Sequence, residues 1–272
     1  MQTRTEQWIF GVAVAVVVLV LIAVVWFRHE PELDAQPDAP AADAVAEPEA
    51  PEHPVAPPDE QALPGDEPPP PLPPLDESDA PVTAELGSVF GESLGDALAA
   101  EALIEKFVAT IDNLPRDKLA ERLRPLGRVP GRFETADGMA ADRYTVSPEN
   151  ERRYDYLVST FVAAPTDQVV ALYRRYYPLM QDSYESLGYP DAYFNDRMVE
   201  VIDHLLATPE PDGTPELVRP HVLYQYADPD LEALSSGQKQ MLRLGPGQRA
   251  DVKDKLREIR AALVEPAADS GG

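Results

Sequence analysis

The sequence DQVVALYRRYYPLMQDSYESLGYPDAYFNDRMVEVIDHLLATPEP, residues 167–211, contains two amphipathic segments separated by Gly188. In residues 167–188 the apolar side chains recur at the three- and four-residue spacing of a helix with one buried face. Residues 193–207 repeat this pattern and end before Pro209. The stretch therefore predicts two helices, and the first should be kinked because Pro178 removes a main-chain hydrogen bond.

The same helical pattern continues on both sides, so residues 81–265 are predicted to form one mainly α-helical domain. Its helices begin or end at serine, proline or glycine, which are common helix boundaries. Further helices are predicted over residues 98–114, 116–123, 147–161, 235–244 and 246–263. Only residues 221–226 alternate as a strand does, so we expect at most a short β element there.

The N-terminal segment WIFGVAVAVVVLVLIAVVWF, residues 8–27, carries no charged or strongly polar side chain. At ~1.5 Å per residue, a helix of this length crosses the ~30 Å apolar core of a bilayer. Aromatic residues stand at both ends, as they do at membrane interfaces. A cleaved signal peptide is the alternative, but its cleavage site needs small residues and this segment ends in Trp26, Phe27 and Arg28. We predict that residues 1–28 are a short tail and an uncleaved transmembrane helix.

The orientation of this helix follows from the basic residues that flank it. Arg4 and the amino terminus precede it, and Arg28 and His29 follow it. No lysine or arginine occurs between Arg28 and Lys106, so little would hold the C-terminal flank in the cytoplasm. We expect a single-pass protein of a bacterial inner membrane, with a cytoplasmic N-terminus and a periplasmic C-terminal domain.

Residues 29–80 contain 15 of the 30 prolines and 15 of the 48 acidic residues of the chain. They have too few large apolar side chains to form a core, and proline and like charges favour extended conformations. We predict a disordered acidic spacer at 29–80 and a disordered tail at 266–272. The tract PPPPLPP, residues 68–74, is either part of a semi-rigid spacer or a ligand for a proline-recognising groove.

Composition excludes several kinds of site. The chain has no cysteine, so it has no disulfide, thiolate metal site or cysteine nucleophile. A net charge of -25 gives no general attraction for nucleic acid. Ser235 and Ser236 lack the sequence context of a nucleophile elbow, and no glycine-rich phosphate loop occurs. We therefore expect no nucleic-acid partner, no cofactor and no bound metal.

Four stretches of the domain resemble an uncharacterised bacterial family, domain of unknown function 3014. They are DNLP (112–115), LGYPDAYFNDRMVEVIDHLLATPEP (187–211), YADPDLEALSSGQKQMLRLGP (226–246) and VKDKLREIR (252–260). The resemblance covers roughly residues 72–263. It implies a Gram-negative protein with one membrane anchor ahead of one domain, and it brings no activity, cofactor or partner.

Acidic residues form one candidate catalytic site, on the predicted helix at 193–207. Asp196, Glu200 and Asp203 lie at positions i, i+4 and i+7, so they share one helix face, with His204 at its edge. Such a set is able to hold a metal or to supply an acid and a base. A solvated acidic face opposite an apolar face is the simpler interpretation.

Tyrosines form a candidate binding site, because all 11 lie between Tyr144 and Tyr226. A tyrosine presents a flat apolar face with a polar tip, which suits peptide or sugar ligands. The candidate binding residues are Tyr173, Tyr184, Tyr193, Asn195, Arg197 and Tyr224. The alternative is that these tyrosines are half-buried and seal contacts between helices.

The expected function is a membrane-tethered binding or scaffolding module of the cell envelope. The long predicted spacer and the lack of catalytic motifs favour this hypothesis over an enzyme. Its partner would be another envelope protein or cell-wall material. The alternative is an envelope hydrolase that uses the carboxylate and histidine cluster, with or without a metal.

Overall fold

The computed structural model describes residues 50–55, 71–91, 94, 98–99, 101–126, 132–137, 142–221 and 223–265. The predicted transmembrane helix, most of the predicted spacer and the tail at 266–272 lie outside these residues. Within the described part of the chain, no helix is long and apolar enough to cross a membrane.

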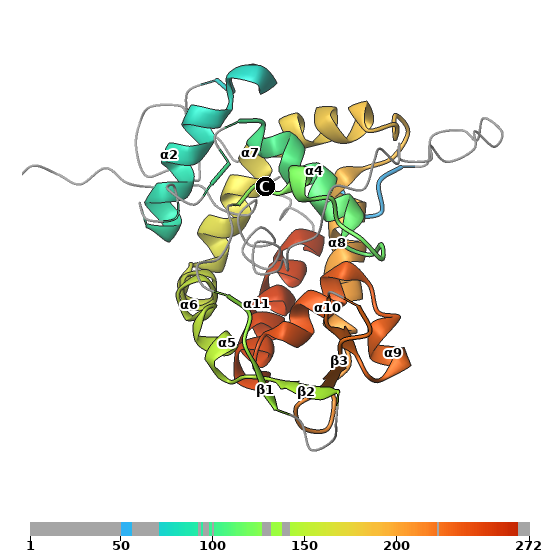
Figure 1. The fold of residues 1–272 in the computed structure, drawn as a ribbon. Coiled ribbons are helices and arrows are strands. Elements are labelled where there is room, and N and C mark those ends of the chain that lie inside the picture. The colour runs from blue at the N-terminus through green and yellow to red at the C-terminus, as the bar shows by residue number, and fades with distance from the viewer. Residues whose placement is uncertain are drawn as a thin grey trace, which may run out of the picture.

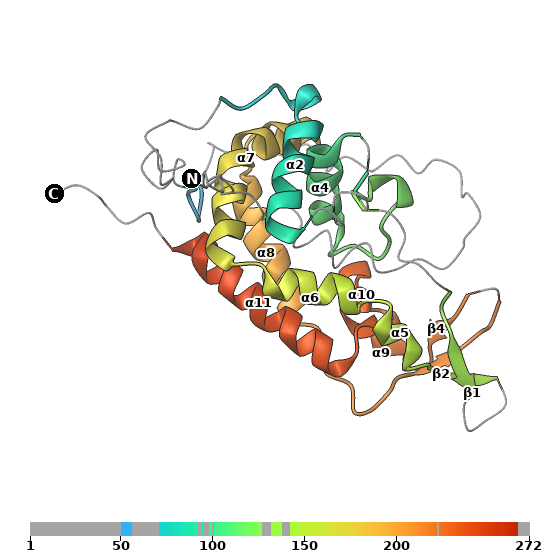
Figure 2. The same ribbon diagram turned by 90° about the vertical axis from the view of Figure 1, so that its left-hand side faces the viewer.

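The fold is mainly helical, and its centre is α8 (Phe194–Leu206). This helix contacts α4 (Leu103–Asn113), α7 (Thr166–Ser186), α10 (Ser236–Arg243) and α11 (Pro246–Val264). Its apolar residues, among them Met198, Val201 and Leu205, are buried in the main core. Figures 1 and 2 show α8 inside the molecule, with α7 bending over one end, and Figure 2 shows α11 running along one side. Pro178 lies inside α7, where the sequence predicted a kink.

Shorter helices cover this centre. They are α2 (Asp79–Phe90), α5 (Glu149–Arg152), α6 (Asp155–Ala163), α9 (Pro229–Glu232) and the 3-10 turns η1 (Leu75–Glu77) and η2 (Glu121–Leu123). The helix predicted over residues 147–161 is observed as two, α5 and α6, which meet at Arg153 and Tyr154. The helix predicted over residues 116–123 is reduced to η2 and the turns before it.

The β structure is larger than the sequence predicted. Strands β1 (Thr135–Asp137), β2 (Arg143–Val146), β3 (Glu216–Val218) and β4 (Gln225–Tyr226) form one antiparallel sheet in the order β1-β2-β3-β4. The expectation of at most a short β element near residues 221–226 was therefore wrong in extent. The strands have two to four residues each, too few for alternation to stand out from a loop.

The sheet lies at the end of the molecule away from α2 (Figure 1) and has a small hydrophobic cluster of its own. Leu217 is paired in register with Tyr144 on one side and Tyr226 on the other. Leu217, Tyr226 and Leu242 are buried, and Phe133 and Tyr224 pack against them. The sheet is thus held to the helices by side-chain packing through α10, which contributes Leu242.

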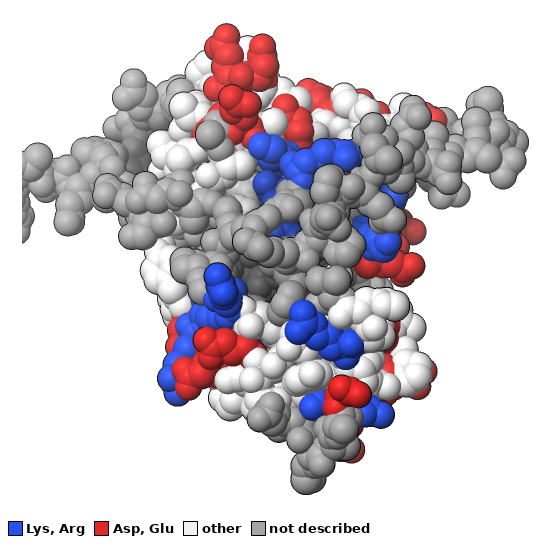
Figure 3. Space-filling model, viewed as in Figure 1, with Lys and Arg blue, Asp and Glu red and all other residues white. Residues whose placement is uncertain are grey.

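Surface charges of the two signs are interspersed. On the face shown in Figure 3, basic and acidic side chains lie in several separate groups. The basic residues near the C-terminus have acidic partners close by: Lys239 is 3.0 Å from Glu232, and Arg249 and Lys253 are both 2.6 Å from Glu210. These ion pairs place acidic side chains next to basic residues of α10 and α11.

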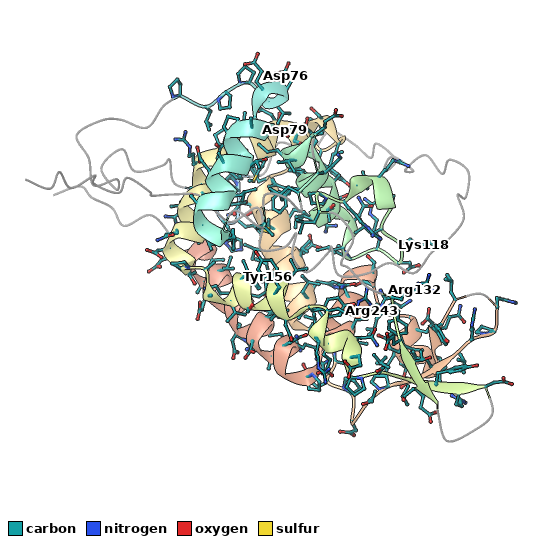
Figure 4. All side chains as sticks on the ribbon, turned by 60° about the vertical axis from the view of Figure 1, so that its left-hand side comes forward. Asp76, Asp79, Lys118, Arg132, Tyr156 and Arg243 are labelled. Carbon is teal, nitrogen blue, oxygen red and sulfur yellow. The ribbon has the colours of Figure 1, made fainter. Side chains whose placement is uncertain are left out.

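Asp79 joins α2 to the start of α4 (Figure 4). Its two carboxylate oxygens accept hydrogen bonds from the main-chain N–H groups of Ala102 and Leu103, each at 2.8 Å. Ala102 has a positive φ of 56°, and its side chain offers no cap to the helix. The carboxylate of another helix therefore satisfies the N–H groups that the start of α4 leaves open.

Helix α10 begins against the end of α4 with little space between them. Ser236 N–H donates to the Arg116 carbonyl at 2.8 Å, and Gly237 N–H donates to the Leu114 carbonyl at 3.0 Å. A Cβ atom at Gly237 would lie 2.8 Å from Leu205 Cδ2 and 3.1 Å from the Leu114 oxygen. Glycine is therefore required here by the close approach of three segments.

Replacing this glycine should destabilise the fold. We expect Gly237→Ala to lower the free energy of unfolding by ~1–3 kcal/mol through overpacking. Gly247→Ala is the control, because it also lies in the first turn of a helix but has nothing within 4 Å of the added Cβ. There the better helix propensity of alanine should raise stability by up to ~1 kcal/mol. Denaturant unfolding of both variants measures the difference, and equal effects would contradict the close contact at Gly237.

Candidate functional site

The start of α8 is fixed by a glutamine from α7. Gln181 Oε1 accepts hydrogen bonds from Phe194 N–H at 2.8 Å and from the Tyr177 hydroxyl at 3.1 Å. Its Nε2 donates to the Ala192 carbonyl at 2.9 Å. Tyr193, the residue at the N-cap position, makes no side-chain cap of its own. The Gln181 side chain therefore caps α8 in place of Tyr193 and fixes the position of its first turn.

The first turn of α8 forms hydrogen bonds with a segment that lies more than 140 residues earlier in the chain. Asp196 accepts hydrogen bonds from two consecutive main-chain N–H groups, Glu52 at 3.0 Å and His53 at 2.8 Å, one on each carboxylate oxygen. Asn195 Nδ2 donates to the His53 carbonyl at 2.7 Å. We call the pair Asn195 and Asp196 the α8 edge. In Figure 1 the segment is the blue trace beside the start of α8.

Buried aromatic side chains lie beneath the α8 edge. Asn195 is fully buried, and so are Tyr173 and Phe194. The ring of Tyr173 lies 5.7 Å from that of Tyr177 and 6.5 Å from that of Phe194, measured between centroids. Among the described residues, Asn195 Oδ1 and the Tyr173 hydroxyl have no hydrogen-bond partner. Two buried polar atoms at and beneath the α8 edge are thus without a hydrogen bond to any described residue.

Two tyrosines next to the α8 edge have raised pKa values. Burial raises the pKa of Tyr177 to about 12, and the Asp196 carboxylate adds to the rise. Burial likewise raises the pKa of Tyr173 well above its usual value, with Tyr177 and Asp196 contributing. Both phenols therefore stay protonated at neutral pH. The carboxylate of Asp196 lies in the first turn of α8, where the helix dipole favours a negative charge.

Arg197 points to the other side of the helix and joins α8 to α4. Its Nε lies 3.1 Å from Asp112 Oδ1, and its Nη2 donates to the Asp112 carbonyl at 2.8 Å. Arg116 donates to the same carboxylate at 2.8 Å, and Glu200 accepts from Arg197 at 2.7 Å. Asp112 is buried. Arg197, a candidate binding residue in the sequence, is thus occupied by contacts between helices.

The candidate catalytic residues have separate partners. Asp196 binds residues 52 and 53, Glu200 binds Arg197, and Asp203 accepts from Arg260 at 2.8 Å. Within the described ranges, no three acidic, histidine or cysteine residues are placed to hold a metal ion. The three carboxylates thus lie on one helix but have different partners, one of which, Arg197, belongs to α8 itself.

His204 contacts a serine rather than a carboxylate. Its Nε2 lies 2.7 Å from Ser235 Oγ, and that oxygen accepts a hydrogen bond from Gln238 N–H at 3.2 Å. Burial lowers the pKa of His204, which favours the neutral ring. Ser235 is the N-cap residue of α10 and is buried. The pair therefore holds the start of α10 against α8.

The candidate tyrosines do not line one groove. Tyr173 and Tyr184 are buried, and Tyr184 stacks on Tyr189 with 4.6 Å between ring centroids. Tyr193 is half-buried next to the α8 edge. Tyr224 lies at the sheet, 5.1 Å from the ring of Tyr144. Of the six candidate binding residues, the structure brings Tyr173, Tyr193 and Asn195 together, while Tyr184 and Arg197 seal helix contacts and Tyr224 lies elsewhere.

Sequence reasoning missed two parts of this arrangement. Gln181 looked like one more polar residue on a helix face, and nothing in its position marks it as the cap of another helix. Residues 52 and 53 lie in the segment predicted as spacer, and they carry no apolar periodicity. Their only signal is the pair of prolines, Pro51 and Pro54, that flanks them.

These features define a mainly helical domain with a small antiparallel sheet. The family model described as a protein of unknown function, DUF3014, matches residues 103–260. This is more than half of the chain, so the chain belongs to that family, as its sequence motifs indicated. Neither the curated proteins nor the solved structures include one that matches it.

Removing the cap from α7 should loosen the α8 edge. We expect Gln181→Ala to lower the free energy of unfolding by ~1–2 kcal/mol, because it leaves the Phe194 N–H without its acceptor. Asp182→Ala is the matched control, since Asp182 is the exposed neighbour on the same helix, and its effect should stay within ~0.5 kcal/mol. Denaturant unfolding compares the two. A Gln181→Ala variant as stable as the control would show that α8 does not need this cap.

Proposed function

We propose that this protein is a binding or scaffolding module of the bacterial cell envelope, and that it binds polypeptide main chain at the α8 edge. Residues 8–27 would anchor it in the inner membrane, and the domain would lie in the periplasm. The observation that carries the proposal is the set of three hydrogen bonds from Asn195 and Asp196 to residues 52 and 53.

The chemistry of these three bonds supports a main-chain ligand. A carboxylate accepts from two N–H groups and an amide donates to one carbonyl, so every atom recognised on the ligand belongs to its backbone. Bonds to a charged acceptor are stronger than neutral ones, which suits a site that binds without reading many side chains. Asn195 and Asp196 lie in the first turn of α8, and Gln181 holds the start of this helix, so the helix limits the freedom of both residues before a ligand arrives.

The alternative of a hydrolase has less support from the contacts. Three of its candidate residues have partners outside α8: Asp196 binds residues 52 and 53, Asp203 binds Arg260, and His204 contacts Ser235. Glu200 is paired with Arg197 of the same helix. Ser235, the hydroxyl nearest to His204, already serves as a helix cap. A polypeptide ligand at the α8 edge would displace residues 52 and 53 and would leave the contacts of Glu200, Asp203 and His204 in place.

The proposed orientation is testable with reporter fusions. Alkaline phosphatase joined after residue 265 should be active in Gram-negative cells, because that enzyme folds only outside the cytoplasm, and β-galactosidase joined at the same point should be inactive. Deleting residues 8–27 should reverse both results. An active β-galactosidase fusion to the full chain would place the domain in the cytoplasm and refute the periplasmic location.

The binding proposal is testable by photo-crosslinking in cells. A photo-reactive amino acid at Tyr193, beside the α8 edge, should give an adduct with a polypeptide that mass spectrometry identifies. The same substitution at Tyr156, which is 49% exposed on α6, is the control and should not give it. Asp196→Asn should reduce the Tyr193 adduct several-fold, because a neutral amide is a weaker acceptor. Adducts with carbohydrate alone, or a yield that Asp196→Asn leaves unchanged, would count against the proposal.

A further inference from the structure

The segment bound at the α8 edge is a bend between two prolines. Glu52 and His53 form the bend, so both of their N–H groups reach the one carboxylate of Asp196. Successive N–H groups that converge in a turn make a binding site for an anion. Pro51 and Pro54 have no N–H, so the two amides between them are the only main-chain donors of residues 51–54. Pro54 also keeps His53 out of the helical conformation.

Apolar packing adds to the contact. Val55 packs against the main hydrophobic core; it is half-buried, as are Pro51 and His53, whereas Glu52 and Pro54 are exposed. Burying part of a valine stabilises the contact, and an exposed glutamate adds little. The bound segment therefore contributes two amides and one carbonyl to the α8 edge, prolines that leave those amides as the donors of residues 51–54, and one aliphatic residue that packs against the core.

Several overlapping stretches before residue 58 have two prolines separated by two residues. Prolines recur at every third position at 48, 51, 54 and 57, in the sequence PEAPEHPVAP. Each Pro-x-x-Pro unit here has two amides between its prolines. The residue that follows differs: Glu52 follows the unit 48–51, and Pro58 follows the unit 54–57. Only the unit 51–54 is followed by a large aliphatic residue, Val55.

The other Pro-x-x-Pro units before the domain fail for different reasons. The unit 37–40 has two amides but is followed by Ala41, which is too small to fill the place of Val55. The three units within residues 68–74 each have a proline at an inner position, which has no N–H to donate. The segment that satisfies all three requirements is the one that is bound.

We propose that the α8 edge is a specific site for the sequence Pro-x-x-Pro followed by a large aliphatic residue, where neither x is proline, and that residues 51–55 of the chain itself are its ligand. This inference rests on the proposed function of the same site and names its ligand class. With the contact formed, 23 residues separate Arg28 from Glu52. A partner carrying the same sequence competes for the α8 edge and releases the domain from this contact.

Distance measurements between two spin labels test the contact within the chain. The protein has no cysteine, so Ala50→Cys and Asp191→Cys, both at exposed positions, are labelled without background. The full chain in detergent micelles should give one narrow, short distance distribution. Glu52→Pro removes one donor and should give a broad distribution at longer distance. Glu52→Ala keeps the N–H group and should leave the narrow distribution unchanged.

A matched pair of variants tests the aliphatic position, Val55. Val55→Ser should broaden the distance distribution, whereas Val55→Ile should not. A broad distribution in the parent chain would overturn the proposed contact. A narrow distribution that survives both Glu52→Pro and Val55→Ser would overturn the recognition of the amide pair and of the aliphatic residue.

A peptide added to the opened site separates this inference from the proposed function. The full chain with Glu52→Pro should bind a fluorescent peptide of residues 48–58, PEAPEHPVAPP, roughly fivefold more tightly than the same peptide with serine in place of Val55. Equal affinity for both peptides, and for one with alanine in place of Pro51 and Pro54, would overturn the sequence specificity and leave the main-chain site intact. Failure of every peptide to bind would overturn the proposed function, even if the labels showed the contact within the chain.

Discussion

The pairing of Arg197 with Asp112 is the constraint on which the position of α8 depends. Asp112 is buried at the end of α4, and Arg197 bonds both its carboxylate and its main-chain carbonyl. A buried carboxylate without its arginine would be strongly destabilising, so the two helices have to meet at this point. Because Arg197 follows Asn195 and Asp196 directly, fixing it also fixes the direction in which the α8 edge faces.

Several polar residues of α8 then contact different parts of the structure. The α8 edge faces residues 52 and 53, Arg197 faces α4, Asp203 faces α11, and His204 faces α10. The periodicity of the sequence predicted the helix and its polar residues correctly. It did not predict their partners, because contacts between residues 31 to 144 positions apart leave no trace in local spacing. A regular acidic face therefore resembled a single site, when it consists of several contacts between elements.

The sequence predicted the long helices because each buries an apolar face over several turns, as α4, α7, α8 and α11 do. It missed the sheet, because strands of two to four residues are stabilised by partners such as Leu217 and Tyr226 rather than by their own pattern. Of the candidate site, Asn195 and Asp196 were identified, but in separate hypotheses. What joins them is the segment around His53, whose composition indicated only a spacer.

The contacts made by Asp79 and His53 also bear on where a stable fragment of this protein begins. The family match starts at residue 103, yet Leu103 receives its helix cap from Asp79, and α2 places Leu86 and Phe90 in the core. A recombinant fragment cut at the family boundary would expose the apolar surface that α2 covers, and would leave the buried amide of Asn195 without its acceptor. A stable fragment therefore has to begin upstream of the region that the family model matches, before α2.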